Sequence, residues 1–218
     1  MSVPSVEALE HAGYATWTPD IQEVIDGWTV RSKGGFTRRV NSATVVGDAA
    51  STSIGTRDRI ASWLEDRSAA LAIRLTPLVG VTTRTEIASW GLVERDTTHV
   101  LVAPARDERT DRFTLVAPGD EQFTKDLERL NDRPDSSAGA WRRLLGRLDD
   151  AVGLWIPDVA VALAARCDDI VMIYSVAVAP AHRRTGLGTD AMRAASSWAH
   201  ARRASWCALK VEGMNAPA

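Results

Sequence analysis

Residues 173–189 read Ile-Tyr-Ser-Val-Ala-Val-Ala-Pro-Ala-His-Arg-Arg-Thr-Gly-Leu-Gly-Thr, and this stretch decides how the second half of the chain folds. Its apolar run predicts a strand that ends at Pro180, and the spacing after Gly186 predicts a helix. The first N–H groups of a helix have no intrahelical partner, and glycines at 186 and 188 let an anion approach them. With two arginines at the rim, the stretch predicts a site for the phosphates of a nucleotide-like cofactor.

The segments on either side of this stretch predict an α/β domain. The strand 170–178 is apolar almost throughout, which indicates that both faces of its sheet are covered. We expect the following order of elements: strand 113–116, helices 121–130 and 138–148, strands 152–156, 159–165 and 170–178, helix 186–203 and strand 206–211.

The first half of the chain predicts a smaller α/β domain. We expect two strands within 27–46 around Gly34-Gly35, a helix capped by Thr56, a strand at 70–75, a short helix at 86–90 and a strand at 99–103. The charged run 105–112 is the best candidate for a linker. The sequence therefore predicts an N-terminal domain over 1–108 and a second domain over 109–218.

Composition excludes several classes of function. The 218 residues carry 26 basic and 28 acidic side chains, a net charge of −2, so we expect no nucleic-acid partner. No run approaches the ~20 apolar residues of a membrane span, and no signal peptide is evident, which favours a cytoplasmic protein. Cys167 and Cys207 form no Cys-x-x-Cys pair and the histidines are scattered, so we expect reduced core thiols and no metal site.

Two other interpretations of this glycine-containing stretch must be weighed first. Gly186-x-Gly188-x-x-Ala191 formally matches a Rossmann fingerprint, with Glu212 where a ribose-binding acid would lie. However, seven residues separate the strand from the first glycine, and one strand is too little to complete a dinucleotide-binding sheet. The other alternative is a turn that only caps a structural helix, but paired arginines beside paired glycines suit an anion better.

The motif Arg183-Arg184-Thr185-Gly186-Leu187-Gly188 resembles the acyl-CoA-binding motif of the GNAT superfamily of N-acyltransferases, Arg/Gln-x-x-Gly-x-Gly/Ala. The preceding Val-Ala-Val-Ala-Pro-Ala-His resembles the end of that family's fourth strand, and residues 211–218 resemble the junction after its fifth strand. The order of elements from 113 onward is also similar. In the first half, Trp28-Thr-Val-Arg with residues 37–42 resembles the leading domain of two-domain bacterial GNAT-like proteins, which implies a degenerate GNAT-like fold there.

This resemblance implies a GNAT-like mixed sheet flanked by helices and acetyl-CoA as cosubstrate. Pantetheine would lie beside the strand that ends at Val178, and the diphosphate would lie on the backbone N–H groups of 184–189. The residues implied in cofactor binding are Val176, Ala177, Val178, Arg183, Arg184, Thr185, Gly186, Leu187, Gly188, Thr189 and Asn215.

The resemblance also implies how an amine could attack the thioester. The backbone N–H of Val176 would polarise the carbonyl, and a base must accept a proton from an amine whose pKa is ~10.4. Candidate catalytic side chains are Glu212 and Tyr174, with Asp168 and Asp169 as further bases. Each has a structural alternative: Tyr174 as a packed aromatic, Glu212 as a solvated strand end, and the two aspartates as turn residues.

One departure from the family concerns the end of the sequence. GNAT enzymes usually continue with a helix that carries a tyrosine and then a strand pair, whereas this sequence ends at Ala218. We therefore expect either a truncated form, or a strand edge covered by the N-terminal half or a partner subunit, such as a second copy of the chain.

The resulting hypothesis is an N-acetyltransferase that acts by direct attack in a ternary complex. Two alternatives are a non-catalytic acyl-CoA-binding module and an NAD-binding oxidoreductase. The acceptor stays open among small amines, antibiotics, peptide N-termini and protein lysines. Arg38, Arg39 and Asn41 either face that acceptor or are ordinary exposed strand residues.

Overall fold

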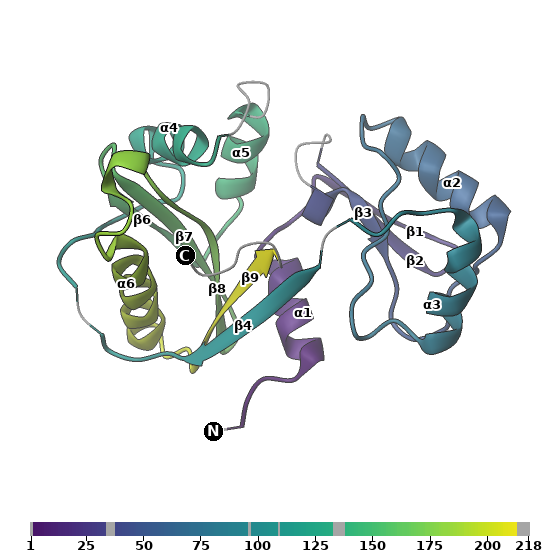
Figure 1. The fold of residues 1–218 in the computed structure, drawn as a ribbon, viewed down its shortest axis with the longest axis horizontal. Helices are drawn as coiled ribbons and strands as arrows, with labels where there is room; N and C mark the ends of the chain where they lie inside the picture. Colours follow the sequence, from purple (N-terminus) through teal and green to yellow (C-terminus); the bar gives the residue numbers. More distant parts are fainter. Residues whose placement is uncertain (1, 34–37, 96, 109, 133–137, 213–218) are drawn as a thin grey trace. The chain divides into compact units, whose positions relative to one another are not determined.

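The computed structural model describes residues 2–33, 38–95, 97–108, 110–132 and 138–212, and it divides into two compact units. The larger unit combines Met1–Thr16 with Asp96–Ala218, and the smaller unit is Trp17–Arg95 (Figure 1). This division differs from the expected boundary after residue 108. The second half of the chain supplies most of the larger unit. The boundary differs because the first helix and the strand 98–104 also pack into this unit.

A six-stranded mixed sheet forms the centre of the larger unit, in the order β4-β9-β8-β7-β6-β5. Neighbouring strands are antiparallel except β8 and β9, which are parallel. The predicted α/β class with a mixed sheet is confirmed. The strands are β4 (Thr98–Pro104), β5 (Thr114–Val116), β6 (Ala151–Ile156), β7 (Ala160–Cys167), β8 (Ile170–Val178) and β9 (Trp206–Glu212).

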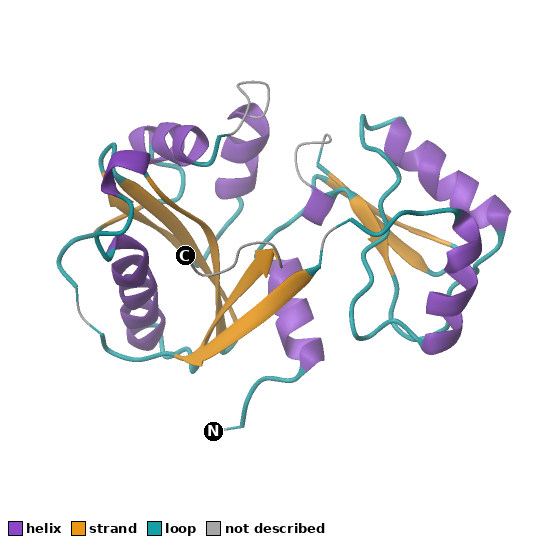
Figure 2. Cartoon of the chain, in the orientation of Figure 1, coloured by secondary structure: helices purple, strands orange, loops and turns teal. Residues whose placement is uncertain are grey.

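Helix α6 (Leu187–Ala201) covers one face of this sheet (Figure 2). Its small apolar residues Ala191, Ala194 and Ala195 let the helix pack closely on β7 and β8, and Trp198 fills the space near its end. The apolar stripe that the sequence shows at helical spacing is therefore the buried face of α6.

Helices α1 (Val6–Ala15), α4 (Glu121–Leu130) and α5 (Ala138–Leu145) complete the larger unit, and α1 and α4 pack on the face opposite α6. A Cβ at Gly153 of β6 would lie 2.8 Å from the Phe123 ring of α4, so only glycine permits this packing. Asp120 caps α4, because its Oδ1 accepts the N–H groups of Gln122 and Phe123 at 3.0 Å.

Strand β4 covers the edge of β9 that the sequence predicts to be exposed. It pairs antiparallel with β9 from Thr98 opposite Glu212 to Pro104 opposite Trp206. This strand had been expected in the N-terminal domain. A segment of the first half of the chain therefore covers this edge.

The smaller unit has a three-stranded antiparallel sheet in the order β1-β2-β3. In its core the ring centroids of Trp28 and Trp90 lie 5.4 Å apart. Strand β1 was not predicted, and the predicted strand 70–75 is reduced to one bridge between Ile73 and Ala43. Ser53, rather than Thr56, caps α2 (Ile54–Glu65). The elements are β1 (Ile21–Ile25), β2 (Trp28–Ser32), β3 (Ser42–Thr44), α2 (Ile54–Glu65), α3 (Val81–Glu86) and the 3-10 helices η1 (Arg38–Val40) and η2 (Ile87–Trp90).

In the described ranges, every helix is too short or too polar to cross a bilayer.

Candidate functional site

Strands β8 and β9 part halfway along β8. Their parallel pairing runs from Ile170 opposite Trp206 to Ile173 opposite Leu209, between the strands labelled β8 and β9 in Figure 1. Beyond that point β8 continues to Val178 while paired with β7, and β9 continues while paired with β4. The second half of β8 therefore has one edge that no described strand covers.

The backbone direction in this half of β8 is set by an irregularity at Ser175. Its φ is 51°, and the register with β7 shifts between Val161 and Leu163. Further on, the N–H of Ala179 donates to the carbonyl of Val159 in a 2.8 Å bond. Alternate residues of a strand direct their N–H and C=O groups to opposite edges, so Val176 and Val178 direct theirs away from β7.

Four residues separate a short 3-10 helix, η4 (Pro180–His182), from α6, which begins at Leu187. Gly186 is the N-cap with φ 84°, a conformation that favours glycine, and its carbonyl accepts the N–H of Asp190 at 3.0 Å. The N–H groups of 187–189 precede this first helical bond and have no intrahelical partner. A Cβ at Gly188 would meet no atom within 4 Å, so packing does not demand a glycine there.

The charge around this N-terminus favours an anion. Arg183 and Arg184 are both exposed, and the Nε of Arg183 donates to the Val178 carbonyl at 3.1 Å. Asp190 in the first turn of α6 is paired with Arg112 at 2.9 Å and with Arg193 at 3.2 Å. Because two cations offset this single carboxylate, it does not oppose a negative ligand at the helix start.

The predicted cofactor residues from Val176 to Thr189 thus lie on one continuous strand, turn and helix start. Asn215 lies outside the described residues. Glu212 ends β9, opposite Thr98 of β4, and its side chain also lies outside the described part.

Tyr174 lies on the face of β8 that α1 covers. Its side chain is buried, and its hydroxyl lies 2.6 Å from the Thr16 Oγ1, which in turn donates to the Ala12 carbonyl at 2.6 Å. Of the two roles that the sequence leaves open for Tyr174, packing is the one that fits these contacts.

Asp168 and Asp169 serve the turn before β8. Asp168 has φ 53°, and Asp169 Oδ1 accepts the Ser205 N–H at 2.8 Å. A strand rises ~3.3 Å per residue, so these carboxylates lie roughly 20 Å from Val176 along β8. As candidate bases they are too distant, and the structural alternative holds for both.

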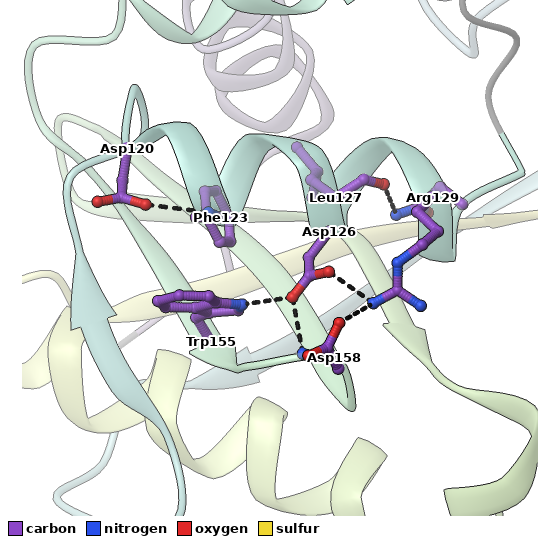
Figure 3. Close-up of polar contacts among 8 residues, drawn as sticks. Asp120, Phe123, Asp126, Leu127, Arg129, Trp155 and Asp158 are labelled. Carbon is purple, nitrogen blue, oxygen red and sulfur yellow. Dashed lines mark hydrogen bonds and ion pairs between the residues drawn. The ribbon is translucent and has the colours of Figure 1, made fainter.

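The second half of β8, residues 175–178, is its open half. A buried carboxylate that sequence analysis did not identify supports this open half. Asp126 of α4 accepts the Trp155 indole N–H at 2.9 Å and the Asp158 backbone N–H at 2.8 Å (Figure 3). Arg129 bridges Asp126 and Asp158. Burial opposes ionisation of Asp126, but hydrogen bonds from Arg129, Trp155 and the Asp158 N–H outweigh it and lower the pKa. The cluster fixes the β6–β7 turn, whose Val159 binds Ala179.

Neither sequence-based interpretation of Asn41 was right. It is buried within the smaller unit, where its Oδ1 accepts the Lys33 N–H at 2.8 Å and the Ser32 hydroxyl at 3.1 Å. Arg38 is exposed on η1, and the side chain of Arg39 lies outside the described part.

Both cysteines are free thiols. Burial raises the pKa of Cys207 to about 11, and burial together with the Asp168 charge raises that of Cys167. Neither thiol lies on the open half of β8: Cys167 ends β7, and Cys207 lies in the paired half of β9.

A family model described as "Probable histone acetyltransferase Rv0428c C-terminal" matches residues 4–218. A search of curated proteins finds no match.

Among solved structures, a GCN5-related N-acetyltransferase from Kribbella flavida has a TM-score of 0.62 and 15% identity, covering 94% of this chain and 84% of its own. A functionally unknown conserved protein from Staphylococcus epidermidis has a TM-score of 0.61 and 13% identity, covering 94% and 87%. A GCN5-related N-acetyltransferase from Sphaerobacter thermophilus has a TM-score of 0.56 and 14% identity, covering 81% and 66%. These likenesses show a shared fold.

Proposed function

The chain belongs to the family described as "Probable histone acetyltransferase Rv0428c C-terminal" and has the GNAT fold, and from this premise we propose that it transfers an acetyl group from acetyl-CoA to an amine.

The observation that carries the proposal is the uncovered edge of β8 leading directly into the N-terminus of α6. An extended pantetheine arm would add to this edge as a strand does, using the backbone groups of Val176 and Val178. The Val178 carbonyl already accepts from Arg183, but its second lone pair can accept an amide N–H. The diphosphate would then reach the N–H groups of 187–189, with Arg183 and Arg184 beside it.

The same geometry supports direct attack on the thioester. Acetyl-CoA supplies an activated acyl group with a thiolate leaving group. The Val176 N–H, fixed by the irregularity at Ser175, would stabilise the negative charge that develops on the carbonyl oxygen. The amine forms the new C–N bond, the C–S bond breaks, and the amine proton goes to a base, for which we propose Glu212 at the end of β9. A covalent acyl-cysteine is not part of this scheme, because neither thiol reaches the open half of β8.

For the acceptor we propose a primary amine. The family description names histone acetyltransferase activity, and this supports testing lysine side chains of basic peptides before small amines. Two free cysteines suit a reducing compartment, so we place the reaction in the cytoplasm.

The proposal is tested by calorimetric titration of the chain with acetyl-CoA and, separately, with NADH, followed by an assay of thiol release with a lysine-containing peptide. We expect acetyl-CoA binding, no NADH binding and acceptor-dependent release of CoA. Binding of acetyl-CoA without release across an amine screen would instead favour an acyl-CoA-binding module. Binding of NADH alone would overturn the assignment.

A further inference from the structure

The fold brings a histidine near the N-terminus beside two consecutive residues of the β7–β8 turn that can also ligate a metal. His11 lies on α1, Cys167 ends β7, and Asp168 begins the turn to β8. In the described part of the chain these form one group whose ligand atoms all lie within 4.8 Å of one another. We propose that His11, Cys167 and Asp168 form a three-ligand Zn²⁺ site.

The distances between the donor atoms suit a tetrahedral ion. The Asp168 Oδ2 lies 3.9 Å from the His11 Nε2 and 3.8 Å from the Cys167 Sγ. In a tetrahedral zinc site, bonds of about 2.0–2.3 Å separate neighbouring donors by about 3.3–3.5 Å. These two donor pairs must therefore close by roughly half an ångström, and the His11 and Cys167 donor atoms, which lie within 4.8 Å of each other, by at most about 1.3 Å. Side-chain rotation can supply such movements, because His11 and Asp168 are 68% and 84% exposed.

The backbone that carries the donors is firmly held. Buried contacts fix α1 on the sheet: the Thr16 hydroxyl meets Tyr174, and Glu10 pairs with Lys210 at 3.4 Å. In the turn, the Arg166 Nε donates to the Asp168 carbonyl at 2.7 Å. Both sides of the site are thus placed before any ion binds, so binding orders only the side chains.

The donor types select the metal. An imidazole, a thiolate and a carboxylate together suit zinc, whereas Mg²⁺ and Ca²⁺ prefer oxygen ligands. The thiolate and the carboxylate supply two negative charges that offset those of Zn²⁺. Three protein ligands leave a fourth position for water or another external ligand.

This site is separate from the proposed acetyl-CoA site. It lies at the start of β8, roughly 20 Å from Val176 at ~3.3 Å per residue. A bound ion would join the N-terminal helix to the β7–β8 turn, two segments of the larger unit between which the chain passes through the whole smaller unit.

The test uses the full chain, freed of metal with a chelator and titrated with Zn²⁺ by calorimetry. Co²⁺ serves as a spectroscopic probe, because thiolate ligation produces a charge-transfer absorbance. We expect one ion per chain and a rise in melting temperature on zinc addition. His11→Gln and Cys167→Ser should each weaken zinc binding by more than about 100-fold, since losing even an outer partner of a metal ligand costs roughly 10- to 100-fold.

Matched controls are His200→Gln, an exposed histidine on α6, and Cys207→Ala, the other thiol. Both should bind zinc like the parent chain. Circular dichroism establishes that each variant is folded, and Asp168→Asn, in the exposed turn, provides a third ligand variant if one fails to fold. The proposal would be overturned if zinc did not bind or if Co²⁺ gave no thiolate band. Equal zinc affinity in the ligand variants would indicate an adventitious ion only and would overturn it as well. Acetyl-CoA binding, measured in parallel, should be the same with and without zinc, so the two proposals fail independently.

Discussion

The two halves of β8 have the same kind of sequence but different surroundings. From Ile170 to Ile173 the strand is paired on both edges and fully buried, whereas from Ser175 to Val178 it is half-exposed and paired with β7 alone. The first half contributes to the core of the larger unit. The second half leaves backbone groups on one edge without a strand partner, and the proposed acetyl-CoA site uses them.

The largest expected difference is in stability. Ile173→Ala should lower the free energy of unfolding by about 2–5 kcal/mol, because a fully buried side chain in a close-packed core leaves a cavity. Val178→Ala, at a half-exposed position, should cost about 1 kcal/mol or less. Urea denaturation of both variants measures the difference, and equal losses would show that the open half is as tightly packed as the paired half.

The next effect concerns binding alone. Replacing Arg183 and Arg184 together by Glu should weaken acetyl-CoA binding by about 100-fold, or ~2.7 kcal/mol, because charge-assisted contacts to the diphosphate are lost. Arg203→Glu, an exposed arginine just beyond the opposite end of α6, is the matched control and should bind normally. Calorimetric titration of the three chains compares them. Unchanged affinity in the double variant would contradict the proposal that the diphosphate binds at the α6 N-terminus.

Asp126→Asn tests whether the carboxylate under the β6–β7 turn supports the open half. At neutral pH the variant should lose about 1–3 kcal/mol of unfolding free energy, since hydrogen bonds to a buried charge are weakened. The folded-state pKa of Asp126 is lowered from 3.8, so its contribution is complete above that value and is lost as pH falls through the folded pKa. Urea denaturation at pH 7 and pH 3 should therefore show a smaller gap between variant and parent at the lower pH. A gap independent of pH would contradict this assignment.

The smallest expected effect separates the two roles of Tyr174. Tyr174→Phe removes the hydrogen bond to Thr16 and should cost about 0.5–1.5 kcal/mol of stability. If the side chain only packs, kcat for the acetyl transfer should stay within error of the parent, with Thr16→Val as the matched change on the other side of the bond. A fall in kcat for Tyr174→Phe alone would restore Tyr174 as a catalytic residue.

Much of the larger unit could be predicted from sequence because its signals are local. The predicted helix 121–130 coincides with α4, and β6, β7, β8, α6 and β9 agree with prediction within a few residues. In the smaller unit, the 3-10 helix η2 ends at Gly91, whose φ of 66° is the left-handed conformation that glycine favours at helix ends. Strand β1 was missed because its side chains are largely exposed and show no clear alternation.

For the candidate site, the sequence identified the strand, the arginines and the glycines, since these lie within one short segment. It could not show that Tyr174 is buried against Thr16, or that Asp126 holds the neighbouring turn, because both contacts join distant parts of the chain. The grouping of His11 with Cys167 and Asp168 was missed for the same reason, and the scattered histidines had indicated that no metal site exists.

The sequence by itself determined the α/β class, most of the elements and the arginines and glycines of the turn after Pro180, where we propose that the diphosphate binds. Periodicity, capping residues and glycine positions encode these features, and they act between near neighbours in the chain. The tertiary structure alone decided that β4 covers β9, that α1 joins the second half of the chain, and that β8 and β9 part after Ile173. Those outcomes depend on strand register and on burial of apolar faces between segments that only the folded chain brings together.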